Sequence, residues 1–222
     1  MKTFRLSVVV LLLTIPFSAA SQYTDAGVWG GVTLKKDLPK GFDLDAEFQF
    51  RSELMGTHLA TVLSDLGASY KINKWMKAAL TYRFGALNGL DNVQSTRHRF
   101  AADLTFDHDF GKPNGSFRIR YQAGQRSTDE NGISDLRDAI RYRVKGDIKL
   151  IKKTRLASSF ELFQGSTDYG FELTDWRWKI GIQHKLKKRQ YLTVGYLLQN
   201  ELHTNDPLME HVVTIGYSYE FK

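Results

Sequence analysis

The chain has 222 residues, with 31 Lys and Arg against 24 Asp and Glu, and it contains no cysteine. Without cysteine the fold receives no support from disulfides. The basic residues recur at strand spacing among acidic ones, and this distribution excludes the continuous basic stripe of a nucleic-acid-binding protein.

The first twenty residues have the three parts of a secretory signal peptide. Lys2 and Arg5 form the basic start, an apolar run follows from Leu6 to Phe17, and Ser18-Ala19-Ala20 is a small-residue cleavage site. The apolar run is too short to span a bilayer of roughly 30 Å as a helix. We therefore expect a signal peptide at residues 1–20 and one mature domain at residues 21–222.

A strict alternation of apolar and polar side chains marks GFDLDAEFQFR, residues 41–51. Alternation with a period of two predicts a β-strand with one apolar and one polar face. No later segment offers the roughly 20 apolar residues of a transmembrane helix, so a membrane-inserted form of this chain has to be a closed barrel. Eleven segments show the alternation: 28–36, 42–51, 61–72, 76–85, 97–110, 117–123, 140–150, 156–164, 176–182, 191–198 and 212–221.

The connections between these segments alternate in length, and aromatic side chains gather at both ends of the strands. Short connections are expected at 36–41, 73–74, 111–115, 151–155 and 187–190. Longer ones are expected at 86–94, 125–138, 165–175 and 200–210. Short periplasmic turns, longer extracellular loops and two aromatic girdles are typical of transmembrane barrels. The pattern predicts an all-β, antiparallel, up-and-down barrel of about 10–12 strands, whose apolar face, with Phe42, Leu44, Phe48 and Phe50, meets lipid.

The number of strands conflicts with a general rule, because bacterial single-chain barrels have even numbers. Ten strands from Phe42 to Phe221 would close the barrel. In a ten-stranded barrel, the segment Val28–Lys36 would be a plug in the lumen. Alternatively, it would be one strand of a twelve-stranded barrel.

Two parts of the sequence resemble outer-membrane barrels. The final TIGYSYEF resembles the C-terminal assembly signal of outer-membrane barrels, which implies recognition by the barrel-assembly machinery through Gly216, Tyr217, Tyr219 and Phe221; the chain departs from that pattern by ending in Lys222. The run from Trp29 through EFQFR, LGASYKI, TYRFG, RHRF, IRYRV and YLTVGY is similar to exported Gram-negative barrels known as domain-of-unknown-function family 2490. This resemblance covers essentially the whole mature chain and implies an outer-membrane location without a known activity.

The polar face of the predicted barrel carries charges of both signs toward the lumen. Because the signs mix on neighbouring strands, we expect cross-strand ion pairs. The two interpretations of this face are a packed network that closes a narrow barrel, and a small-solute pore with basic bias. The predicted luminal network comprises Asp43, Asp45, Glu47, Arg51, Arg83, Arg97, Arg99, Asp103, Asp107, Arg118, Arg120, Arg141, Arg143, Asp147, Glu161 and Arg177.

No catalytic set, cofactor site or metal site is predicted. Ser158 and His184 are the one weak candidate pair of a lipid-modifying enzyme, but no third group is placed to orient the histidine. The loop STDENGISD resembles half of a calcium loop without the closing Glu. We expect a largely closed structural or binding barrel with any recognition at the outer loops; the alternatives are a porin-like pore, a soluble periplasmic lipocalin-like carrier of an apolar ligand, and that enzyme.

Overall fold

The computed structural model describes residues 23–53, 58–88, 94–111, 113–128, 132–133, 137–167, 170–204 and 207–221. The predicted signal peptide lies outside these ranges. Within them, none of the helical residues forms a span long and apolar enough to cross a membrane.

Strands make up almost all of the described chain, and one short 3-10 turn, η1 (Pro39–Gly41), joins the first two. The twelve strands are β1 (Tyr23–Asp37), β2 (Phe42–Glu53), β3 (His58–Lys71), β4 (Met76–Asn88), β5 (Gln94–Asp109), β6 (Asn114–Thr128), β7 (Gly132–Ile133), β8 (Arg137–Ile151), β9 (Thr154–Thr167), β10 (Gly170–Lys187), β11 (Gln190–Glu201) and β12 (Leu208–Phe221).

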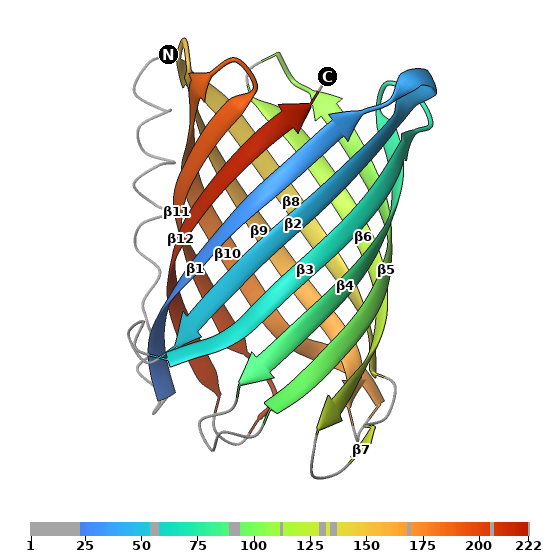
Figure 1. Ribbon diagram of the computed structural model, residues 1–222, viewed down its shortest axis with the longest axis vertical. Coiled ribbons are helices and arrows are strands. Elements are labelled where there is room, and N and C mark those ends of the chain that lie inside the picture. Colours follow the sequence, from blue (N-terminus) through green and yellow to red (C-terminus); the bar gives the residue numbers. More distant parts are fainter. Residues whose placement is uncertain are drawn as a thin grey trace, which may run out of the picture.

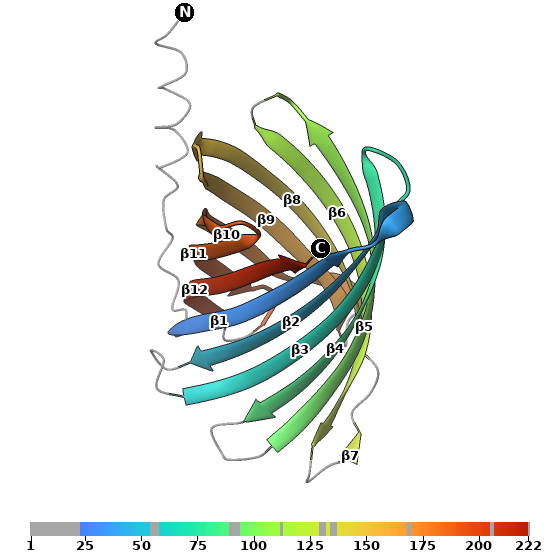
Figure 2. The same cartoon turned by 45° about the horizontal axis from the view of Figure 1, so that its top comes forward.

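Eleven of these strands form the wall of a closed barrel. Each long strand pairs antiparallel with the next along the chain, and β1 pairs with β12 to close the ring. The two-residue strand β7 pairs, among the described residues, with the end of β6 at Ser127 and Thr128 alone. Figure 1 shows the strands running obliquely around the barrel, with the turn between β1 and β2 at the top and β7 at the bottom. Figure 2 shows the same ring with β1 between β2 and β12.

The eleven wall strands lie within the predicted range of about 10–12, and the closing pair corrects only the expected placement of Val28–Lys36. Val28–Lys36 belongs to β1, which is neither a plug nor one of twelve wall strands, and it runs parallel to β12 from Tyr23 to Lys36. An odd number of strands requires this arrangement, because the first and last strands of an up-and-down barrel with eleven strands point the same way. The even-number rule therefore does not hold for this chain.

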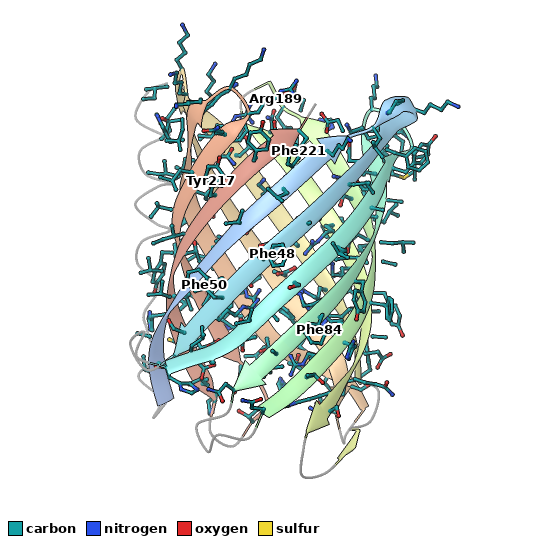
Figure 3. All side chains as sticks on the ribbon, viewed as in Figure 1. Phe48, Phe50, Phe84, Arg189, Tyr217 and Phe221 are labelled. Atoms are coloured by element: carbon teal, nitrogen blue, oxygen red, sulfur yellow. The ribbon has the colours of Figure 1, made fainter. Side chains whose placement is uncertain are left out.

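The alternation of the sequence becomes an outside and an inside. Phe48 is 56% exposed and Val144 59%, whereas Asp65 is 8% exposed and Glu161 5%. The strands thus turn most of their apolar side chains outward and most of their charged ones inward, as predicted, while a few apolar residues such as Trp29 and Leu197 are buried inside. Figure 3 shows Phe50 and Phe84 toward the long-loop end, and Tyr217 and Phe221 toward the end with the short turns. Tyr191 begins the predicted strand 191–198 at its short-turn end, where an outward aromatic of the girdle is expected. It instead lies on the luminal parity and donates a hydrogen bond to Glu220, at 3.3 Å.

The strands reach further into the predicted loops than expected. Gly165–Asp175, predicted as a loop, is largely strand: β9 continues to Thr167, β10 begins at Gly170, and Gly170 pairs with Thr167. A register shift between Leu173 and Asp175 compensates for this longer hairpin. Register counted across the predicted loop 165–175 would put Ser158 near Ile182, but the pairing and the bulge together place Ser158 opposite Ile180.

Candidate functional site

The lumen contains a cavity of about 680 Å³ lined mainly by charged and polar side chains. Twelve of the sixteen predicted luminal residues line it: Asp45, Glu47, Arg51, Arg83, Arg97, Arg99, Arg118, Arg120, Arg141, Arg143, Glu161 and Arg177. Lys35, Asp65, Asp175 and Lys179 complete the charged lining, so that eleven basic side chains face five acidic ones. The lining is therefore strongly cationic.

The remaining four predicted residues lie around this cavity or at its rim. Asp103 is buried and binds arginines of the lining. Asp43 pairs with the exposed Lys71 at 3.4 Å, and Asp147 pairs with the exposed Arg155 at 3.1 Å. Asp107 is exposed near the short-turn end of β5.

Three buried carboxylates organise the lining. Asp65 accepts two hydrogen bonds of 2.5 Å from Arg83, and Asp103 does the same with Arg120. Glu161 joins two strands, because its oxygens each accept a bond of 2.7 Å, one from Arg118 on β6 and one from Arg141 on β8. Charge-assisted pairs with this geometry are the strong hydrogen bonds of protein interiors.

Aromatic rings continue this network across the barrel. Arg141 and Arg177 lie over the ring of Phe163, at 4.4 and 5.0 Å from its centre. Arg177 also lies 5.3 Å from the ring of Trp29, over which Arg51 stacks at 3.8 Å. Stacking of guanidinium groups on rings is favourable and is stronger when water is excluded. We call this continuous set the luminal layer: Arg118, Glu161, Arg141, Phe163, Arg177, Trp29 and Arg51.

Trp29 and Phe163 are absent from the predicted network. Trp29 shares the inward parity of Thr33 and Lys35, and its burial in a cluster with Leu197 and Val212 follows from that parity. An aromatic residue at a polar position of the alternation was the signal for its role.

The expectation of opposite charges on neighbouring strands holds only in part. Four directly opposed pairs consist of two arginines each, on β4, β5, β6 and β8. These pairs are Arg83 with Arg99, Arg97 with Arg126, Arg118 with Arg143, and Arg120 with Arg141. The carboxylates reach most of their partners diagonally or across a strand, which the sequence alternation does not reveal.

The weak catalytic candidates have separate partners. Ser158 accepts a hydrogen bond of 3.1 Å from the indole of Trp178, while His184 is 2.9 Å from the hydroxyl of Thr154. Both residues lie on the outward face, as predicted, but they stand four positions apart in register. The geometry therefore does not join them into a nucleophile and base.

The other predicted features fall at the ends of the barrel. Gly216, Tyr217, Tyr219 and Phe221 belong to β12, and the rings of Tyr219 and Phe221 meet edge to face at 4.8 Å. Lys222 lies outside the described residues, as do Asp129, Asn131 and Asp135 of the calcium-like loop. In the described ranges, no group of three or more His, Asp or Glu is placed to hold a metal ion.

Comparison with known families agrees with the resemblance inferred from the motifs. The model of the family described as protein of unknown function (DUF2490) matches residues 26–210, from β1 to the start of β12. The chain belongs to this family. Among solved structures, this DUF2490 protein is similar to the crystal structure of the beta domain of the Bordetella autotransporter Brka, with 13% identity and a TM-score of 0.48. That match covers 83% of this chain and 86% of the other. No curated protein matches the chain.

Proposed function

We propose that this DUF2490 protein is an integral outer-membrane barrel that acts as a binding barrel, with a lumen closed to free passage. The outward face supports insertion into lipid, since side chains such as Phe48, Leu80 and Ile215 are about half exposed or more. A closed barrel leaves no unpaired backbone edge in the bilayer. We further propose that β12 is the strand by which the assembly machinery recognises the chain.

The luminal layer is the main observation in support of a closed lumen. Its contacts run from Arg118 on β6 through Glu161 and Phe163 to Arg177, and then to Trp29 and Arg51 on β1 and β2. Paired and stacked groups of this kind hold one another in place across the lumen, and this supports a closed state. Narrow barrels are filled by side chains in the same way.

The cavity of about 680 Å³ favours the second candidate, a narrow pore for small solutes. Its charged lining is unsuited to the apolar ligand of a lipocalin-like carrier, because buried charges without partners are costly. An enzymatic role is not part of this proposal. Accordingly, we expect Ser158→Ala to leave the lipid composition of the cell unchanged.

Two measurements test the proposal. The protein should fractionate with the outer membrane and resist extraction by carbonate, whereas recovery from the soluble periplasm would contradict a membrane location. In planar bilayers the wild-type protein should give little or no conductance. Trp29→Ala should increase the conductance, because it removes the ring on which Arg51 and Arg177 stack. Trp75→Ala, in an exposed turn, is the matched control. Stable, large openings of the wild type would move the assignment to a porin.

A further inference from the structure

One side of the lumen concentrates arginine side chains on four neighbouring strands. We call it the arginine wall, and it consists of the four opposed arginine pairs on β4, β5, β6 and β8: Arg83, Arg97, Arg99, Arg118, Arg120, Arg126, Arg141 and Arg143. All but Arg126 line the cavity.

Opposed like charges on neighbouring strands repel each other, and the repulsion is greater where water is excluded. Three buried carboxylates bind this wall, and they engage Arg83, Arg118, Arg120 and Arg141. Among the described residues, no carboxylate lies within ion-pair distance of the remaining cavity-lining members, Arg97, Arg99 and Arg143. Arg143 stands opposite Glu161 in the register, but the two oxygens of Glu161 bind Arg118 and Arg141 instead. The wall therefore keeps guanidinium groups without an ion-pair partner beside the cavity.

Some hydrogen-bond donors of this wall also lack an acceptor within the described part of the protein. The Nε atoms of Arg118, Arg141 and Arg143 are buried and have no acceptor among the described protein atoms. Arg118 is only 9% exposed and Arg141 only 7%, and both border the cavity. Buried donors of this kind ordinarily have partners, and charged ones especially so.

We propose that the arginine wall binds a small, multiply charged oxyanion, a carboxylate or a phosphate, that enters from the aqueous lumen. The planar fork of a guanidinium matches the oxygens of both groups, and several forks on neighbouring strands favour a ligand with more than one anionic group. A cavity of about 680 Å³ has the size of a small-molecule site. The ligand supplies the negative charge that Asp65, Asp103 and Glu161 do not.

This inference rests on the proposed binding function, of which it names the ligand class, and its test is independent of conductance. The purified full-length barrel in neutral detergent is titrated calorimetrically at low salt with citrate, pyrophosphate and acetate, and with glycerol as an uncharged control. Citrate and pyrophosphate should bind at least about tenfold more tightly than acetate, and glycerol should not bind. Equal binding of acetate and citrate, or no binding of any anion, would overturn the proposal.

Arg99→Gln separates a ligand-binding role from a structural one. Because Arg99 faces Arg83 and has no carboxylate partner in the described part of the chain, its loss should weaken citrate binding by about tenfold or more, while the unfolding midpoint at low salt stays equal or rises. Arg99→Lys keeps the positive charge but loses the planar guanidinium group, so its affinity for citrate should lie between those of the wild type and Arg99→Gln. Arg155→Gln at the exposed rim is the matched control and should leave citrate binding unchanged. Unchanged citrate affinity in Arg99→Gln would refute the site.

A last arm identifies the source of the anion, since a phosphate group can belong to a soluble molecule or to a lipid head group. The citrate titration is repeated in vesicles of phosphatidylcholine with and without phosphatidylglycerol. If the ligand is a soluble anion, citrate should occupy the site to the same extent in both kinds of vesicle, after correction for the surface charge of the vesicles. Specific competition by phosphatidylglycerol, absent from Arg99→Gln, would overturn the assignment to a soluble anion.

Discussion

The two sides of the lumen are stabilised in different ways. The arginine wall on β4 to β8 is held by a few buried carboxylates among many guanidinium groups. The opposite side, where β1 meets β12, buries an apolar cluster in which Val212 is 1% exposed and Leu197 2%. Parallel pairing is slightly weaker per residue than antiparallel pairing, so packing reinforces the barrel at its one parallel contact. Charge is concentrated where the pairing is antiparallel and needs no such support.

Glycine contributes to the side that closes the barrel. A Cβ atom on Gly31 would lie 2.8 Å from the backbone oxygen of Phe48, and one on Gly27 would lie 2.3 Å from that of Ser52. These positions let β1 approach β2 more closely than a strand with side chains there. Trp29 lies between these glycines on the inward parity of β1 and packs beside Leu197, so the sequence of β1 contributes to the difference between the two sides.

The largest effect is expected from Glu161→Gln, which tests the arginine wall. Arg118 and Arg141 would lose the carboxylate that both of them bind, and breaking a buried pair from one side costs about 3–5 kcal/mol of unfolding free energy. Urea titration, followed by the difference in gel mobility between folded and unfolded barrel, measures the change. Ser159→Ala on the same strand is the control; a loss in Glu161→Gln no greater than that of this control would mean that the wall does not depend on Glu161.

Leu197→Ala tests the apolar side in the same assay. Truncation of a buried leucine removes contacts and leaves a cavity, at a cost of about 2–5 kcal/mol. Leu186→Ala, at an exposed position near the end of β10, should change stability much less. If both variants lost equal stability, the cluster of Trp29, Leu197 and Val212 would not be what reinforces the closing pair.

Ile215→Arg asks whether the outward face near this closing pair lies in lipid. Ile215 is 47% exposed on the outer surface, and an arginine near the middle of the bilayer costs roughly 2–4 kcal/mol. Thr193→Arg, on the neighbouring strand and facing the lumen, should cost less. The assembled fraction in outer membranes and the urea midpoint in lipid both report the difference, and equal losses would contradict the assignment of inside and outside.

Much of the fold follows from the sequence because alternation is a property of the strand itself. From Phe42 to Phe221 the period of two predicts which side chains point outward, and the structure places most of them so, with Tyr191 as an exception. Pairing between distant strands has no such local signal. The parallel contact of β1 with β12 depends on chain ends separated by nearly the whole sequence, and the even-number rule could not supply it.

The candidate site could likewise be predicted only in part from the sequence. Parity alone brings twelve of the predicted charges to the cavity, but partners depend on register and on the reach of long side chains. Arg118 extends past β8 to Glu161, and Arg120 stands directly opposite Arg141, which the sequence does not show. The extension of β9 and β10 into a predicted loop likewise shifted Ser158 by two positions.

The smallest effect is expected at the rim, where Asp43→Asn removes the charge that pairs with Lys71. The two groups are 3.4 Å apart, but the Lys71 side chain is 57% exposed, so water competes for both charges. Exposed pairs of this kind contribute about 0–1 kcal/mol, and the loss should shrink further as salt is added.

Asp65→Asn is the matched comparison, because Asp65 also pairs with a single cation but lies inside the barrel. Its two bonds to Arg83 are 2.5 Å long, and both side chains are largely buried. Removal of this carboxylate leaves Arg83 facing Arg99 without a countercharge, so the loss should exceed that of Asp43→Asn several-fold and persist at high salt. Equal losses at the rim and in the arginine wall would show that position in the lumen does not determine the strength of these pairs.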